Sequence, residues 1–255
     1  MKLACIIPVH NMAATVGRAI NSAFDAGCDD VVVVDDCSTD STPSVLAGFG
    51  DRITVWRWPR KPSEWVAAQR VVWDATNADH YTWLSADDYL MPGFAEVVRR
   101  HADAGVVFTD YAVVRPDGHH LWMVSQEVHS PTRLTGEQMR ARIKTNRNAT
   151  ESGSGSSLRA DVARWLWANN FERMGPHADS VGYAAAAATF GCALVPFTGA
   201  AFTMTETSYS RDAVNTQEKA MHWAKTCREF LSRVGLDDET SDALVMKRCG
   251  VRVGQ

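Results

Sequence analysis

The chain has 255 residues, of which 45% are hydrophobic and 22% are charged, and its net charge at pH 7 is −4. This length and apolar content are sufficient for a sizeable buried core in one large domain. Acidic and basic residues are interspersed, which argues against a general nucleic-acid-binding or membrane-surface protein. The one basic run, residues 140–148 (RARIKTNRN), is typical of a solvated helix face, with phosphate binding as the alternative.

The cysteine pattern favours a reducing compartment. The six cysteines are widely scattered, without a Cys-x-x-Cys pair or a spacing suited to zinc, so we expect free thiols and a cytoplasmic location. The N-terminal apolar run ends at Pro8 and is too short for a signal sequence or a membrane span. We therefore expect no transmembrane segment.

The first hundred residues alternate between apolar runs and helical stripes. Residues 2–9 (KLACIIPV) and the four valines at 31–34 are typical of strands buried on both faces, and further strands are predicted at 52–58 and 80–84. Amphipathic helices are predicted at 16–24, 65–75 and 92–102, with a short helix after Ser41 or Thr42. The alternation predicts a mixed, mostly parallel sheet with helices on both faces.

The second half has a different pattern. Residues 104–125 predict an antiparallel hairpin around a Pro-Asp-Gly turn. Residues 148–161 (NATESGSGSSLRAD) predict a Gly/Ser-rich loop, and a plain linker and a mobile substrate-covering loop are equally good interpretations. An alanine-rich helix is expected to end at Gly191, followed by a strand at 192–197 and a long amphipathic helix over 220–234.

Polar pairs follow three of the predicted strands: His10-Asn11, Asp35-Asp36 and Asp87-Asp88. Ligands of such sheets bind beyond the carboxyl ends of the strands. Asp36 could accept hydrogen bonds from a base or a ribose, while Asp87 and Asp88 suit Mg²⁺ or Mn²⁺ shared with the diphosphate of a nucleotide. Such a cation would stabilise charge on a departing diphosphate. The alternative for the acid pair is a solvated turn that precedes the next helix.

Two common phosphate-binding motifs are absent from the sequence. There is no G-x-x-x-x-G-K-[ST] loop, and the first predicted strand is followed by PVHNMAATVG rather than by G-x-G-x-x-G. This argues against P-loop and dinucleotide-binding enzymes.

Three motifs in order carry a family resemblance: IIPVHNMAATVGRAINSAF, VVVVDDCSTDST and YTWLSADDYLMPG. Together they resemble the N-terminal half of family 2 glycosyltransferases of the GT-A fold. The resemblance covers roughly the first 110 residues. It implies transfer of a sugar from a nucleotide-diphosphate donor, commonly with inversion at the anomeric carbon and with a divalent cation.

The resemblance implies roles for the strand ends. Pro8, Val9 and His10, with Asn11 beside them, would line the nucleoside pocket, and His10 stands where many members have a base-contacting tyrosine. The pair Asp35-Asp36 would contact the base or ribose, chiefly through the second carboxylate.

The third motif would hold the metal ion. Asp87 would lie near the ribose and the metal, and Asp88 would be the principal protein ligand of the metal. Ser85 replaces an aspartate that many members carry, but the final acid pair is intact.

The second half departs further from the family. Asp179 is the candidate general base for the acceptor hydroxyl, with a helix N-cap as the alternative role. Thr205 stands where relatives have a late histidine, so Glu206 or water would have to replace that ligand. Arg70 is a candidate diphosphate contact, for which a surface salt bridge is the alternative.

The predicted protein is thus a metal-dependent inverting glycosyltransferase. We expect a nucleotide-sugar-binding half over residues 1–110, an acceptor-side half of the same domain over 111–210 and a C-terminal helical extension over 211–255. The partners are a UDP-linked donor, with guanine and thymine nucleotides as alternatives, and a hydroxyl-bearing acceptor, which could be a saccharide, a protein or a modified DNA base. The alternative function is a nucleotide-sugar-binding module without catalysis.

Overall fold

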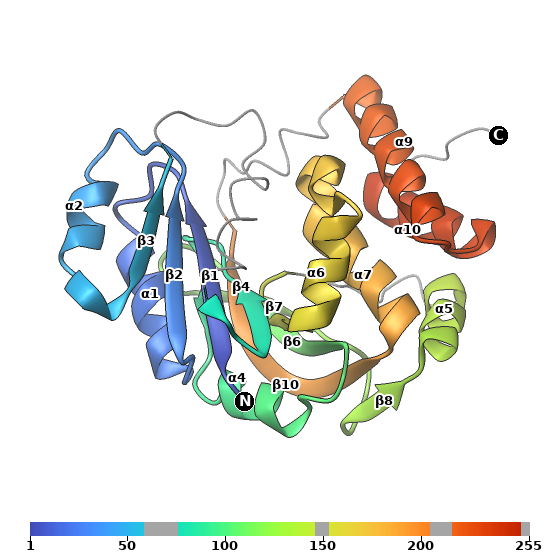
Figure 1. Cartoon of the computed structure of the whole chain (residues 1–255), viewed down its shortest axis with the longest axis horizontal. Helices are drawn as coiled ribbons and strands as arrows, with labels where there is room; N and C mark the ends of the chain where they lie inside the picture. The colour runs from blue at the N-terminus through green and yellow to red at the C-terminus, as the bar shows by residue number, and fades with distance from the viewer. Residues whose placement is uncertain (59–75, 146–152, 205–215, 251–255) are drawn as a thin grey trace.

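A mixed β-sheet forms the centre of the protein, as seen in a computed structural model that describes residues 1–58, 76–145, 153–204 and 216–250 (Figure 1). Over these residues the sheet has ten strands in the order β3-β2-β1-β4-β9-β6-β10-β5, with β7 beside β6 and β8 beside β10. The strands are β1 (Leu3–Val9), β2 (Asp30–Asp35), β3 (Thr54–Arg57), β4 (His80–Trp83), β5 (Tyr89–Leu90), β6 (Val106–Val114), β7 (His120–Val124), β8 (Thr132–Leu134), β9 (Ser156–Arg159) and β10 (Cys192–Thr203).

Helices cover both faces of this sheet. The helices are α1 (Val16–Asp25), α2 (Thr42–Ala47), η1 (Gly50–Arg52), α4 (Phe94–Arg100), α5 (Gly136–Thr145), α6 (Ala160–Ala168), η3 (Phe171–His177), α7 (Ala178–Phe190), α9 (Gln217–Arg233) and α10 (Asp238–Cys249). In Figure 1, α1 and α2 lie at the β2–β3 end of the sheet, and α5, α9 and α10 lie at the opposite end.

The N-terminal strands form the predicted parallel unit. β1 pairs in parallel with β2 on one side and with β4 on the other, and Val9 lies opposite Asp35. Alternate residues of β1 enter two separate cores: Ala4 and Ile6 face the large core beneath α6 and α7, while Leu3, Cys5 and Ile7 face α1 and α4. A strand buried on both faces requires a continuous apolar run, which is why the sequence pattern predicted β1 and β2 correctly.

The centre of the sheet contains a strand that the sequence analysis missed. Within the segment predicted as a Gly/Ser-rich loop, β9 lies between β4 and β6 and is antiparallel to both. Ser156 and Ser157 are buried, with exposed fractions of 2% and 0%. Both serines have a polar atom in a hydrogen bond: Thr82 Oγ1 donates to the Ser156 carbonyl oxygen (2.7 Å), and His80 Nδ1 pairs with Ser157 Oγ (3.2 Å). The loop interpretation is therefore wrong for residues 156–159.

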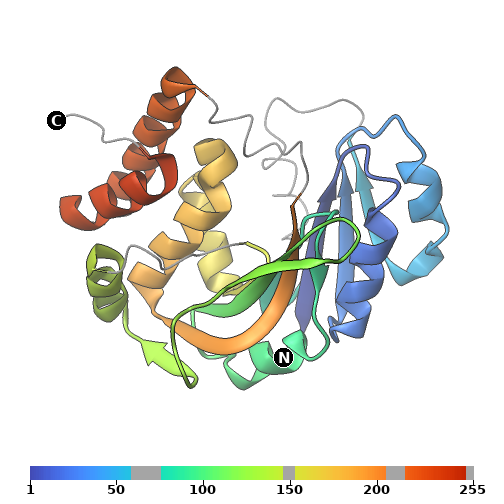
Figure 2. The same cartoon turned by 180° about the vertical axis from the view of Figure 1, so that it is seen from behind.

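The other elements that were predicted in the second half are present. β6 and β7 form the antiparallel hairpin. Helix α7 ends at Gly191, whose φ of +78° favours glycine. β10 is longer than the predicted strand and curves along β6, to which it pairs in parallel (Figure 2). Because β10 is this long, Thr203 at its C-terminal end reaches the turn that follows β4, where its N–H binds Asp88.

The C-terminal helices α9 and α10 pack against each other, and α9 also contacts η3 while α10 contacts α5 and α7. Their buried residues, including Leu231 and Leu244, belong to the same core as α7. The boundary that we placed after residue 110 falls inside β6. Among the described helices, none is both long and apolar enough to cross a bilayer.

We expect Leu158→Ala in β9 to lower the free energy of unfolding by about 2–5 kcal/mol, because Leu158 is fully buried in the larger core and its truncation leaves a cavity. Urea unfolding followed by circular dichroism measures this change. Leu121→Ala, at a half-buried position on the mostly exposed strand β7, is the matched control and should cost clearly less. Equal losses in the two variants would contradict a central position for β9.

Candidate active site

The ends of β1 and β2 are joined by side chains. His10 Nδ1 donates to the Asp36 carbonyl oxygen (2.6 Å), and the Asn11 backbone N–H donates to Ser38 Oγ (2.9 Å). The Asn11 side-chain oxygen accepts from the backbone N–H of Thr39 (2.8 Å). Asn11 therefore shapes the turn after β2, in addition to its predicted place beside the nucleoside pocket.

The two aspartates after β2 differ in their surroundings. Asp35 is 1% exposed, accepts from the Ser38 N–H (2.9 Å) and forms an ion pair with Arg57 Nε (3.4 Å). Its carboxylate holds the turn and the edge strand, so a donor contact through Asp35 has little support. Asp36 is 6% exposed and lies one residue beyond the strand. A base or ribose contact through Asp36 stays a prediction.

Asp88 is enclosed at the end of β4. It is 1% exposed, its Oδ2 accepts from Ser154 Oγ (2.8 Å) and its Oδ1 accepts from the Thr203 N–H (2.8 Å). We predicted Asp88 as the principal metal ligand, yet both of its oxygens already bind groups of the protein. In the structure, Asp88 connects the β4–β5 turn to the segment before β9 and to the end of β10.

Asp87 is held through its main chain instead. Its carbonyl oxygen accepts from Thr203 Oγ1 (2.6 Å) and from the Arg18 guanidinium. The Asp87 side chain is half-buried, and no other residue in the described ranges donates a hydrogen bond to its carboxylate. Of the two predicted metal ligands, Asp87 is thus the one whose carboxylate is available.

The acid pair is electrostatically unfavourable as it stands. Burial, followed by the neighbouring Asp87 charge, raises the pKa of Asp88 to about 7. Burial also raises the pKa of Asp87, although Arg18 opposes this change. A cation beside Asp87 would favour the charged forms of both groups. The donor set of hard carboxylate oxygens suits Mg²⁺ or Mn²⁺.

Asp179 lies in the first turn of α7, where the N-cap residue is His177, so the alternative role of Asp179 as N-cap is wrong. Its Oδ1 accepts from the Ser180 N–H (2.7 Å), and its Oδ2 accepts from the Gly153 N–H (3.2 Å). Because Gly153 precedes the Ser154 that binds Asp88, one short segment contacts both carboxylates. The structure thus brings the candidate base and the acid pair to one site.

Some predicted residues lie outside the described ranges. Arg70, Thr205 and Glu206 are among them, so their roles stay predictions. Sequence reasoning missed Arg18, Ser154 and Thr203, which hold the acid pair. The glycines on either side of Ser154 were the available signal, because they indicate close approach of the backbone to another group.

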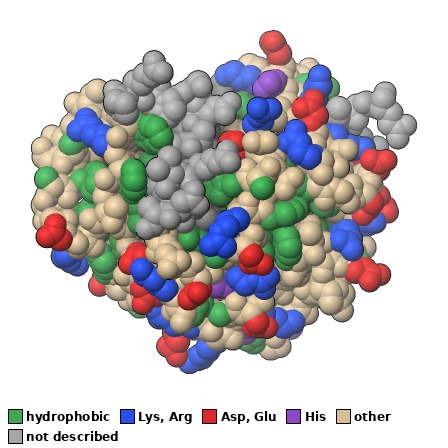
Figure 3. Space-filling view, viewed as in Figure 1, with side chains coloured by type: hydrophobic (Ala, Val, Ile, Leu, Met, Phe, Trp, Pro, Cys, Tyr) green, Lys and Arg blue, Asp and Glu red, His purple; other side chains and the backbone are tan. Residues whose placement is uncertain are grey.

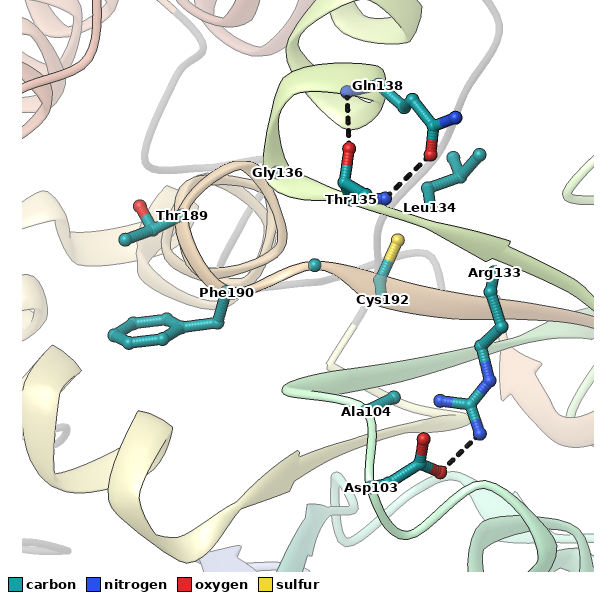
Figure 4. A pocket seen from close by; sticks show the side chains of 11 residues that line it. Asp103, Ala104, Arg133, Leu134, Thr135, Gly136, Gln138, Thr189, Phe190 and Cys192 are labelled. Atoms are coloured by element: carbon teal, nitrogen blue, oxygen red, sulfur yellow. Dashed lines mark hydrogen bonds and ion pairs between the residues drawn. The ribbon is translucent and has the colours of Figure 1, made fainter.

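A surface hollow of about 370 Å³ lies elsewhere (Figure 4). It is lined by the start of α5, the end of α7 and residues near the N-terminal ends of β6 and β10, with an ion pair between Arg133 and Asp103 at one side. Asp36 and the pair Asp87-Asp88 instead follow the C-terminal ends of β2 and β4, and Asp88 binds Thr203 at the C-terminal end of β10. This hollow is therefore separate from the candidate active site.

Comparison with known proteins now identifies the family. A family model described as "Glycosyl transferase family 2" matches residues 4–167, well over half of the chain. The chain belongs to this family. The match includes all three motifs at the strand ends and continues through β9 and most of α6, so it extends beyond the region of the predicted resemblance.

Individual relatives agree with the family. The succinoglycan biosynthesis protein ExoO of Rhizobium meliloti (strain 1021) is 32% identical over 133 residues, which are 48% of this chain and 36% of that protein. This chain therefore matches only about a third of the length of ExoO.

Solved structures with a similar fold include S. aureus TarS. TarS 1-349 in complex with UDP-GlcNAc has a TM-score of 0.68 at 16% identity, over 96% of this chain and 70% of that one. The complex of the same fragment with UDP has a TM-score of 0.65 at 16% identity, with the same coverage. These similarities confirm the GT-A-like α/β fold of this family 2 member.

We expect the stability of the cation-free protein to fall as pH rises from about 4 to 7. The folded protein holds the Asp88 proton more tightly than the unfolded chain, whose carboxyl pKa is near 3.8, so deprotonation costs up to about 1.4 kcal/mol per pH unit in this range. Asp88→Asn keeps both hydrogen-bond positions and should flatten this slope. Urea unfolding with a chelator at several pH values measures it.

The control for this measurement is Asp117→Asn, at the exposed hairpin turn. If Asp88→Asn retains the full slope of the wild type, the assignment of this pH dependence to Asp88 is contradicted. Adding Mn²⁺ to the wild type should reduce the slope, because a bound cation lowers the pKa of nearby carboxyls.

Proposed function

We propose that this family 2 member transfers a sugar from a UDP-linked donor to a hydroxyl acceptor, with inversion and with a divalent cation. The observation that carries the proposal is the pair of adjacent contacts, Ser154 to Asp88 and Gly153 to Asp179, which unite a donor-side and an acceptor-side carboxylate. Inverting transfer needs both: one side must bind the departing diphosphate, and the other must take a proton.

The donor would bind at the ends of β1, β2 and β4. His10 and Asp36 lie side by side there, since the His10 ring bonds the Asp36 backbone, and they are suited to a base or ribose. The binding of UDP-GlcNAc and UDP by S. aureus TarS, which has this fold, supports a UDP-linked donor.

Mn²⁺ or Mg²⁺ would be held by Asp87, with buried Asp88 behind it. In the described ranges there is no cluster of three or more histidine, cysteine or acidic side chains that could hold a metal ion. The protein would therefore share the ion with the donor diphosphate and water, as is usual for Mg²⁺. A bound cation would supply charge neutralisation to the departing diphosphate. Arg18 and Thr203 would keep Asp87 in place through its carbonyl oxygen.

Asp179 would take the proton of the acceptor hydroxyl. Its side chain is half-buried and lies in the first turn of α7. The hydrogen bonds from Gly153 and Ser180 orient it. A fixed carboxylate beside the acceptor can remove the proton as the new C–O bond forms.

The acceptor would be a saccharide hydroxyl. ExoO is named for succinoglycan biosynthesis, which supports this class. The basic run offers little support for a DNA acceptor, because the guanidinium groups of Arg140 and Arg142 bind the carbonyl oxygens of Ala188 and Gln126. Positive and negative side chains are also mixed over the face shown in Figure 3. A cytoplasmic location remains part of this proposal.

We expect Asp179→Asn to lower the rate of sugar transfer by at least about 100-fold, because the amide cannot accept the proton. Its affinity for UDP with Mn²⁺ should stay close to that of the wild type. Release of UDP from UDP-sugars with a panel of saccharide acceptors measures transfer. A wild type that binds UDP with Mn²⁺ but transfers no sugar would instead support a non-catalytic binding module.

We expect Asp87→Ala to weaken Mn²⁺-dependent UDP binding by about tenfold or more, since it removes the available carboxylate of the site. Isothermal titration with and without Mn²⁺ measures this change. Asp51→Ala, an exposed acid in η1, is the control for loss of one negative charge. Unchanged affinity in Asp87→Ala would contradict the assignment of the cation to this side chain.

A further inference from the structure

The segment Gly153–Gly155, which we call the bridge segment, contacts both halves of the candidate active site. Ser154 Oγ donates to Asp88 Oδ2 (2.8 Å), and the Gly153 N–H donates to Asp179 Oδ2 (3.2 Å). The two carboxylates lie on different elements, the β4–β5 turn and α7, yet neighbouring residues of the bridge segment bind them. Ser154 itself is only 7% exposed.

The other end of the bridge segment is fixed by β6. The Gly155 carbonyl oxygen accepts from both the Thr109 N–H (3.1 Å) and Thr109 Oγ1 (2.6 Å). The φ of Gly155 is +76°, and a Cβ there would lie 3.1 Å from Thr109 Oγ1 and 3.2 Å from the Cβ of Ala200. Glycine is therefore required at this position, and the segment has little room to shift.

Gly153 lies directly against Asp179. A Cβ at Gly153 would be 3.0 Å from Asp179 Oδ2 and 3.2 Å from the Asp179 Cβ. Any movement of this residue is thus transmitted to the Asp179 carboxylate, both through the hydrogen bond and through contact.

We propose that Ser154 is a positioning residue for sugar transfer, which sets the place of Asp179 relative to the acid pair. The inference rests on the proposed function, in which Asp179 is the base. The Ser154 hydroxyl fixes the bridge segment to the buried Asp88 carboxylate, and the adjacent Gly153 N–H orients Asp179. A displacement of the donor-side turn therefore moves the acceptor-side carboxylate with it.

The two carboxylates depend on Ser154 to different degrees. Without its hydroxyl, Asp88 keeps the Thr203 N–H and stays in place. Asp179 then keeps its contacts with Ser180 and Gly153, but Gly153 is no longer tied to Asp88 through the neighbouring hydroxyl, and the bonds of Gly155 to Thr109 fix only the far end of the segment. Loss of the hydroxyl should therefore affect the chemical step more than donor binding.

The first test is Ser154→Ala in the transfer assay. We expect kcat to fall about tenfold, which corresponds to about 1.4 kcal/mol, while KM for the UDP-sugar changes less than about twofold. A kcat within twofold of the wild type, or a loss confined to KM, would overturn the inference.

Ser157→Ala is the matched control for a general loss of stability. Ser157 is buried too, lies three residues further along the chain in β9 and bonds His80, but it is not hydrogen-bonded to either carboxylate. Both variants lose one buried hydroxyl, so both should unfold at lower urea concentration, and only Ser154→Ala should lose kcat. An equal loss of kcat in both variants would overturn the positioning role.

The second test measures the coupling without turnover. Ser154→Ala, Asp179→Asn and the double variant form a double-mutant cycle, in which the change in unfolding free energy is measured with urea; linked groups give non-additive changes.

A third variant tests the contact of Gly153 with Asp179 in the transfer assay. Gly153→Ala, which pushes on Asp179 directly, should lower kcat as Ser154→Ala does and leave Mn²⁺-dependent UDP binding intact.

The outcomes separate this inference from the proposed function. A wild type without any transfer would overturn the proposed function, and the catalytic role of Ser154 with it. An active wild type whose cycle is additive would overturn this inference alone.

Discussion

A buried carboxylate joins three parts of this protein that are distant in sequence, at the C-terminal ends of the central strands. Asp88 accepts one hydrogen bond from Ser154, which precedes β9, and one from the backbone of Thr203 at the end of β10. Removal of either donor would leave a buried charged group with an unpaired oxygen, which is costly. The approach of the segment before β9 and of the end of β10 to the β4–β5 turn therefore depends on this one side chain.

The same constraint links stability to function. Two adjacent carboxylates, one of them almost fully enclosed, are unfavourable in the protein alone, as the raised pKa of Asp88 indicates. A fold that retains such a pair keeps it at the expense of stability, which is expected at sites that bind a cation or another ligand. Arg18 and Thr203 donate to the Asp87 carbonyl oxygen and not to its carboxylate, so the carboxylate stays available for a cation or another ligand.

The polar residues at the ends of β1 and β2 have divided tasks. Asn11 has a left-handed backbone, and its side chain accepts from the turn after β2, while Asp35 holds Ser38 and Arg57. Asn11 and Asp35 thus form the turn at these strand ends, and His10 and Asp36 lie next to it. Residue type alone predicted correctly that polar residues follow these strands, but it did not distinguish the side chains that form the turn from those that could contact a nucleotide.

Local pattern in the sequence determined the N-terminal strands and α7, because continuous apolar runs and an alanine-rich run ended by Gly191 each favour one type of element. It also placed three polar pairs at strand ends. Only the tertiary structure decided that 156–159 is a central strand and that Ser154 binds Asp88, 66 residues away. Such contacts follow from the order of the strands in the sheet, which local periodicity does not encode, and polar residues become buried there only because their partners come from distant segments.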